Sequence, residues 1–132
     1  MTPTPMILPP QPADGDGLAV RGTTLVICNW RVEGMERDVA PLHVHHADDE
    51  AWHVVSGALR FRFDSRQLIA RAGSTVLVPA GVPHTFGNAG PEPSRFIIIL
   101  PARLEELINQ LHESSPAEHP DIYRRHQSEL LE

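Results

Sequence analysis

Turn-forming residues divide this chain into short segments, and this division restricts the fold more than any other feature of the sequence. Thirteen prolines and nine glycines are spread over 132 residues. Between them lie short runs of β-branched, aromatic or alternating apolar and polar residues, which are typical of strands. The runs cover residues 18–20, 23–32, 41–46, 50–56, 59–63, 68–71, 75–78, 84–86 and 95–100. We therefore predict an all-β fold built as two sheets or a barrel.

Two of these predicted strands carry expectations about burial. Residues 95–100 hold the most apolar run, Phe96-Ile97-Ile98-Ile99-Leu100, and we expect this strand to be buried on both faces. In the strand at 23–32, alternation separates two faces. One face carries Leu25, Ile27, Asn29 and Arg31, and the other carries Val26, Cys28, Trp30 and Val32.

The two ends of the chain follow other patterns. Residues 1–17 form a proline-rich N-terminal arm, either extended or disordered, because proline lacks a backbone donor. In the extended case, Met6-Ile7-Leu8 would lie across a partner subunit. After the β domain at 18–101, residues 102–132 form a C-terminal helical segment. Its first helix is indicated by apolar residues at helical spacing, Leu104, Leu107, Ile108 and Leu111.

A second helix is predicted from Asp121 to about Leu131, with Asp121 as its cap. We expect both helices to pack on the outside of the β domain. The alternatives are a lid over the open end of that domain or a contact between two subunits.

The composition argues against nucleic acid and membrane partners and against a disulfide. The formal net charge is −6, from 17 acidic and 11 basic residues, and no basic patch is present, which argues against nucleic acid. Cys28 is the single cysteine, so no intrachain disulfide can form. No apolar run approaches the ~20 residues of a membrane helix, and no secretory signal is recognisable. We expect a cytoplasmic protein without a membrane partner.

Histidines and one carboxylate cluster in two segments of the predicted β domain. His43 and His45 are two residues apart, so on a strand they point to the same face. Glu50 follows after a polar turn that can bring its carboxylate back. His84 begins another strand, after a turn that contains Pro79, Gly81 and Pro83. Three imidazoles and a carboxylate converging from rigid strands predict a site for a divalent transition metal ion.

The two segments resemble the signature motifs of the cupin superfamily. The first reads His43-x-His45-x4-Glu50-x6-Gly57, and the second reads Gly73-x5-Pro79-x-Gly81-x2-His84-x3-Asn88. The second segment matches at every defined position. The first departs from the family in lacking a glycine about six residues before its first histidine. The resemblance covers roughly residues 20–101 and implies a jelly-roll β-barrel with short C-terminal helices.

The resemblance also implies a ligand set and a reaction. His43, His45, Glu50 and His84 would all bind one divalent ion, which could be Fe, Mn, Ni, Co, Cu or Zn. The segment around these residues and the C-terminal helices look most like small bacterial quercetin-dioxygenase-like cupins. That likeness implies a dioxygenase acting on a small enol or diol-like substrate that chelates the ion. Glu50 would serve as a catalytic base if it detached from the ion. Cupins of this type commonly form homodimers, and we expect one here.

Two alternatives stay open. One is non-oxidative chemistry on the same ion, by an isomerase, lyase or cyclase. The other is a non-enzymatic module that binds a metal or a small molecule. No hydrolase triad, phosphate-binding glycine loop or pair of carboxylates for glycoside chemistry is recognisable in the sequence.

Four further residues are candidates for the substrate pocket. Trp52 and Phe86 are expected to face inward as pocket walls, because each lies two residues from a predicted ligand on the same strand. Asn29 and Arg31 are polar residues in an apolar strand that could hold a substrate carboxylate or enolate, although they could equally face solvent. We expect His46 and His53 to point away from the site, and Asp48 and Asp49 to be solvated loop acids.

Overall fold

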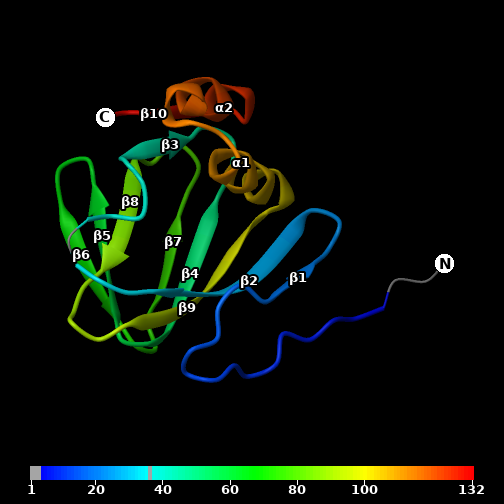
Figure 1. Cartoon of the computed structure of the whole chain (residues 1–132), viewed down its shortest axis with the longest axis vertical. Coiled ribbons are helices and arrows are strands. Elements are labelled where there is room, and N and C mark those ends of the chain that lie inside the picture. Colours follow the sequence, from blue (N-terminus) through cyan, green and yellow to red (C-terminus); the bar gives the residue numbers. More distant parts are fainter. Residues whose placement is uncertain (1–3, 36) are drawn as a thin grey trace.

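The computed structural model describes residues 4–35 and 37–132, which form two antiparallel sheets facing one another (Figure 1). The first sheet has the strand order β1 (Ala19–Arg21), β2 (Leu25–Val32), β9 (Ser94–Pro101), β4 (Glu50–Ser56) and β7 (Thr75–Val78). The second has the order β10 (Ser128–Leu130), β3 (His43–His45), β8 (His84–Asn88), β5 (Ala58–Phe63) and β6 (Gln67–Arg71). The prediction of a largely β fold is therefore confirmed.

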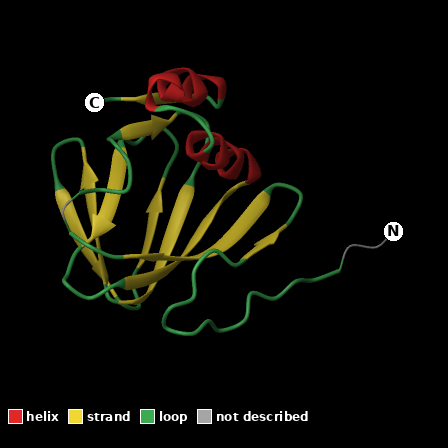
Figure 2. Cartoon of the chain, in the orientation of Figure 1, coloured by secondary structure: helices red, strands yellow, loops and turns green. Residues whose placement is uncertain are grey.

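Closure of the sheets into a barrel is not seen. Among the described residues, every hydrogen-bonded strand pair lies within one sheet or the other. The architecture is thus a two-sheet sandwich with two short helices at one end (Figure 2).

The core lies between the sheets and follows the period-two alternation of the strands. In β9, Phe96, Ile98 and Leu100 are each about 1% exposed, whereas Ile97 and Ile99 are half-buried on the outer face. The expectation that this strand is buried on both faces was therefore wrong. A run of five apolar residues need not be covered on both sides, since an antiparallel sheet can keep one face toward solvent.

The C-terminal helices lie across one end of the sandwich and not on its outside (Figure 1). Helix α1 spans Ala102–His112, and a 3₁₀ turn at Pro116–Glu118 leads into α2 at His119–Arg125. Both helices contribute side chains to the space between the sheets. Of the arrangements considered from the sequence, the lid over the open end agrees with the structure.

The second predicted helix is shorter than expected. It ends at Arg125, and Gln127 takes a positive φ of 55° that turns the chain into β10. Strand β10 then pairs with β3, so that Ser128 lies opposite His45 and Leu130 opposite His43. The last residues thus extend the sheet that carries two of the predicted ligands.

Ion pairs fasten α1 to both sheets. The guanidinium of Arg103 donates to the Asp48 carboxylate at 2.7 and 3.0 Å, in the loop between β3 and β4. Arg21 of β1 makes a two-point contact with Glu105 of α1 at 2.9 and 2.8 Å. Asp48 is only 6% exposed, so the expectation of a solvated loop acid was wrong for this residue. Asp49 is exposed and accepts from the backbone N–H of Ala80.

Residues 4–17 run beside the first sheet without helix or strand. Their contacts with the sheet include hydrogen bonds from the Gly17 N–H to the Asn29 carbonyl and from Arg95 to the Gln11 carbonyl. Met6 and Ile7 are 57% and 81% exposed. No helix in the described ranges is long and apolar enough to cross a membrane.

Candidate metal centre

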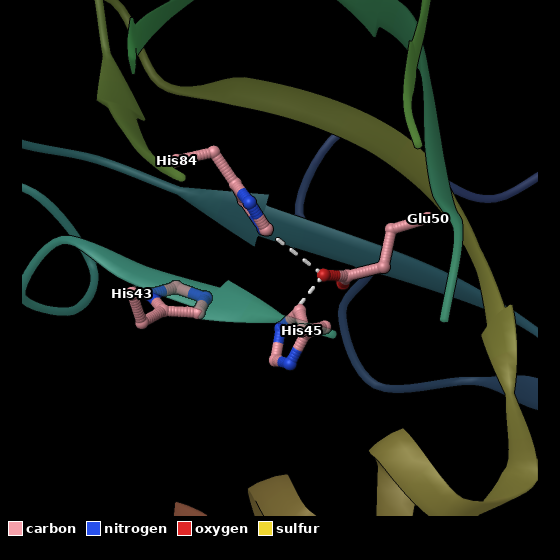
Figure 3. Close-up of side chains that lie close together, drawn as sticks. All are labelled: His43, His45, Glu50 and His84. Carbon is pink, nitrogen blue, oxygen red and sulfur yellow. Dashed lines mark hydrogen bonds and ion pairs between the residues drawn. The ribbon is translucent and has the colours of Figure 1, made fainter. Parts of the chain in front are cut away.

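The four predicted ligands meet between the two sheets (Figure 3). His43 and His45 project from β3, His84 from β8 and Glu50 from the facing strand β4. One nitrogen or oxygen from each residue lies within 4.8 Å of those of the other three, and all four side chains are buried. The proximity follows from strand pairing, because His43 and His84 are direct partners in the β3–β8 ladder.

A glycine turn sets the start of β8. Gly81 has φ +87°, a conformation that side chains rarely tolerate, and its N–H donates to the His45 carbonyl at 2.8 Å. This hydrogen bond ties the turn before His84 to the strand that carries His45. The motif glycine therefore positions one ligand against another.

Each of the three imidazoles is held through its Nδ1 atom. The Nδ1 atoms of His43 and His84 lie 2.8 and 2.9 Å from the carbonyl oxygens of Pro41 and Val82. A carbonyl oxygen can only accept, so these nitrogens carry the proton. His45 Nδ1 lies 2.7 Å from Ser128 Oγ, whose own hydroxyl donates to the His126 carbonyl, so His45 donates as well. A neutral ring thus has its lone pair on Nε2, and only a ring with a second proton can donate a hydrogen bond from Nε2.

The Nε2 atoms of His45 and His84 point at the Glu50 carboxylate. They lie 3.0 and 3.1 Å from its Oε1 atom. Burial acts to raise the pKa of Glu50, but its hydrogen bonds with His45 and His84 outweigh this effect and lower the pKa to about 2. Burial also lowers the pKa of His43 to about 4, helped by the neighbouring His84 and His45. The residues thus present an ionised carboxylate and a neutral imidazole.

This arrangement fits a metal cation. Two Nε2 lone pairs and a negatively charged carboxylate oxygen repel one another at this distance. A proton or a metal cation between them removes the repulsion. Neutral imidazole and carboxylate are the ligands preferred by divalent Fe, Mn, Co, Ni, Cu and Zn. Hydrogen bonds at Nδ1 of the kind seen here orient metal-binding histidines and fix their tautomer. The four residues can therefore hold one transition metal ion.

The metal centre opens into a cavity of about 660 Å³ between the sheets and the helices. Its wall is mostly apolar and includes, besides the four ligands, Trp52, Phe86, Phe96, Ile98, Leu104, Leu107, Ile108 and Tyr123. Trp52 packs edge-on to His84, with 5.9 Å between the ring centres. A cavity of this size accommodates a small organic molecule.

The other two pocket candidates occupy different places. Asn29 is buried but does not line the cavity, because alternation along β2 turns Cys28 and Trp30 toward it instead. A contact between Asn29 and a substrate stays a prediction. Arg31 lies at the cavity edge, where its Nη1 atom is 3.1 Å from Glu33. His46 and His53 are exposed and bind Glu129 and Thr75, away from the metal centre.

Two residues at the site come from the C-terminal segment and were not among the sequence candidates. Ser128 of β10 orients His45, as described above. Tyr123 of α2 packs against His43, with 5.5 Å between the ring centres. Burial raises the pKa of Tyr123 to about 12, with a contribution from the charge of Glu50. No local pattern in the sequence indicates the contact of Tyr123 with a histidine 80 residues earlier.

Solved structures of other proteins share the fold of this chain. An uncharacterised conserved protein with a double-stranded β-helix domain from Klebsiella pneumoniae is 24% identical, with a TM-score of 0.56 over 69% of this chain and 76% of that one. A cupin-2 domain containing protein from Shewanella frigidimarina is 23% identical, with a TM-score of 0.55 over 67% and 83%.

A sugar phosphate isomerase from a cupin superfamily, from Silicibacter pomeroyi, is 25% identical, with a TM-score of 0.54 over 60% of this chain. The match covers 51% of that isomerase, so this chain spans about half of its length. No curated protein matches the chain. The family model described as the cupin domain matches residues 30–100, which include all four metal-site residues and more than half of the sequence. The chain therefore belongs to the cupin family.

Proposed function

We propose that this cupin is a metal-dependent dioxygenase for a small, largely apolar substrate that presents two neighbouring oxygens, as an enol or diol-like compound does. One observation carries the proposal. Three imidazoles and a carboxylate open directly onto an apolar cavity of about 660 Å³ that two helices cover. Four protein ligands leave two positions on an octahedral ion for a bidentate ligand.

The chain's own residues would bind and shield the substrate. His43, His45, Glu50 and His84 hold the ion, which when redox-active supplies Lewis acidity and a centre for reaction with dioxygen. Trp52 and Phe86 offer aromatic walls to the body of the substrate. Leu104 and Leu107 of α1 line the cavity and would shield a bound substrate from water on that side.

Glu50 has a second role in this proposal as a base. In the ion-free site, hydrogen bonds with His45 and His84 lower its pKa to about 2, which makes it a weak proton acceptor. It would take a proton from the substrate only after its carboxylate had detached from the ion, because burial acts to raise its pKa. Proton transfer is thus coupled to release of the carboxylate.

A metal-dependent isomerase, lyase or cyclase is the second candidate, and the similarity to a sugar phosphate isomerase favours it. The cavity wall supports a less polar substrate than a sugar phosphate. Its two arginines in the described part of the chain, Arg21 and Arg31, are paired with Glu105 and Glu33. A non-enzymatic binding module is the remaining alternative.

The test is oxygen uptake by protein reconstituted separately with iron, manganese, cobalt, nickel, copper or zinc, using a panel of enols, catechols and 1,2-hydroxyketones. We expect uptake with at least one redox-active ion and none with zinc. His84→Ala should lose both the ion and the activity. Turnover without oxygen in zinc- or manganese-loaded protein would favour the isomerase or lyase. Unchanged activity in metal-free His84→Ala would contradict both enzymatic proposals.

A further inference from the structure

Tyr123 lines the cavity but has no role in the proposed function. It is the only tyrosine of the chain and lies on α2, outside the residues 30–100 that match the cupin domain. Its side chain is 3% exposed and lines the cavity next to the metal centre. The family motifs therefore give no role to a phenol that the C-terminal segment brings to the site.

The Tyr123 side chain lines the cavity and is almost fully buried there. Its ring is buried, yet no residue in the described ranges accepts or donates a hydrogen bond at its oxygen. Buried side-chain atoms that are fully covered and unpartnered in those ranges belong to Asn29, Arg31 and Trp52, and the Tyr123 oxygen is not among them. A buried tyrosine usually satisfies its hydroxyl with a partner. The open cavity is thus where its partner can bind.

The Tyr123 ring lies at the end of the cavity that holds the four ligand residues. The Tyr123 ring is tilted by 55° to the His43 ring, with 5.5 Å between their centres. His43 belongs to the ligand cluster, whose donor atoms lie within 4.8 Å of one another. A molecule that reaches the ion from the cavity therefore passes within range of the phenol.

We propose that the Tyr123 hydroxyl donates a hydrogen bond to an oxygen of the chelating substrate and so selects oxygen chelators for this site. The inference rests on the proposed function, because it requires a metal ion held by the four ligands. Tyr123 acts as a positioning and specificity residue. A hydrogen bond to an oxyanion is stronger than one between neutral groups, so the phenol favours substrates that carry enolate or diolate character.

The experiment compares two chelators on zinc-loaded wild type and Tyr123→Phe protein. Maltol binds metals through two oxygens, whereas 2,2′-bipyridine binds through two nitrogens and has no acceptor left for the phenol. We expect maltol to bind about 10- to 100-fold more weakly to Tyr123→Phe, the loss typical of a hydrogen bond to a charged group. Affinities for zinc and bipyridine should stay within about twofold, since Phe preserves the ring packing.

Nuclear magnetic resonance gives a readout that structural damage would not imitate. Since the chain has one tyrosine, protein labelled with ¹³C-tyrosine gives a single Cζ signal. We expect this signal to move when maltol is added to the zinc-loaded protein and to stay in place with zinc alone. A large shift with zinc alone would make the phenol a metal ligand and overturn the proposal.

The outcomes separate this inference from the proposed function. Equal maltol affinity in wild type and Tyr123→Phe would overturn the role of Tyr123 and leave the metal centre standing. If Tyr123→Phe lowered the affinities for maltol and bipyridine equally, Tyr123 would have a structural role only. This outcome also contradicts the inference. Failure of wild-type protein to bind zinc or any other transition ion would overturn the proposed function, and the inference with it.

Discussion

Single residues of the metal centre are oriented before any ion binds. The Nδ1 atoms of His43, His45 and His84 all have acceptors within 2.9 Å, two of them backbone carbonyls. Their rings are therefore aimed by the protein, and little reorganisation accompanies metal binding. Burial also lowers the pKa of His43, which has a consequence for the metal-free protein.

The metal-free protein should lose stability in mild acid because of His43. The unfolded chain takes up a proton there below about pH 6.5, whereas the folded protein does so only near a pKa of about 4. The stabilisation is thus present above pH 6.5 and is lost as the pH falls toward 4. We expect the free energy of unfolding, measured in urea with a chelator present, to drop by about 2 kcal/mol between pH 7.5 and pH 5 through this residue.

His43→Gln supplies the control for this prediction. The amide does not titrate, so the drop over the same pH range should be smaller in the variant by about 2 kcal/mol. Glu50 does not confuse the comparison, since its lowered pKa affects stability only below its ordinary value of 4.5. An equally steep pH dependence in wild type and variant would contradict the burial argument.

At the scale of elements, strand β10 adds an orienting residue to the metal site formed by β3, β4 and β8. β10 pairs with β3 and places Ser128 opposite His45. The side chain of Ser128 is buried, accepts from His45 Nδ1 and donates to the His126 carbonyl. Besides the β10–β3 pairing, the C-terminal segment thus contacts the ligand His45 through one hydroxyl.

Removal of that hydroxyl should weaken the metal centre without unfolding the protein. We expect Ser128→Ala to lower the affinity for zinc by about 10- to 100-fold, the usual effect of deleting a group that orients a metal-binding histidine. Competition with a coloured chelator measures this affinity. His46→Ala is the matched control, because His46 adjoins His45 but is exposed, and its affinity should match the wild type. Wild-type affinity in Ser128→Ala would rule out the orienting role.

The elements differ in how far the sequence could predict them. The ligand positions of His43, His45 and His84 were predictable because strand alternation and turn residues are local properties. β10 was missed because Ser128 to Leu130 form a strand only through pairing with β3, more than 80 residues earlier. The burial of Asp48 and the contact of Tyr123 with His43 were not predicted for the same reason, since their partners come from distant parts of the chain.

At the scale of the molecule, the outer face of the first sheet is an apolar surface. A row of half-buried or exposed side chains crosses four neighbouring strands, with Ile27 beside Ile99, Ile99 beside Ala51 and Ala51 beside Leu77. Leu25, Val55 and Leu77 on this face are 49%, 40% and 63% exposed. Contiguous apolar surface of this kind commonly marks an interface between proteins. Met6 and Ile7 of the N-terminal arm are also exposed.

We propose that a second copy of the chain covers this face, which keeps the homodimer expected from the sequence as a prediction. Light scattering should give twice the chain mass at micromolar concentration. Leu77→Glu should yield a monomer, because it buries a charge in the interface. Ile69→Glu is the control, since Ile69 is 49% exposed on the other sheet and its replacement should leave the dimer intact. A monomeric wild type would contradict the proposal.

Metal content tests the account of the whole molecule most directly. Protein purified without added metal or chelator is compared with a His43→Ala/His84→Ala double variant by elemental analysis. We expect about one equivalent of a transition metal in the wild type, because one such four-residue cluster is found among the described residues, and almost none in the variant. A wild-type protein that contains no metal, and takes up none of iron, manganese, cobalt, nickel, copper or zinc on reconstitution, would contradict the account.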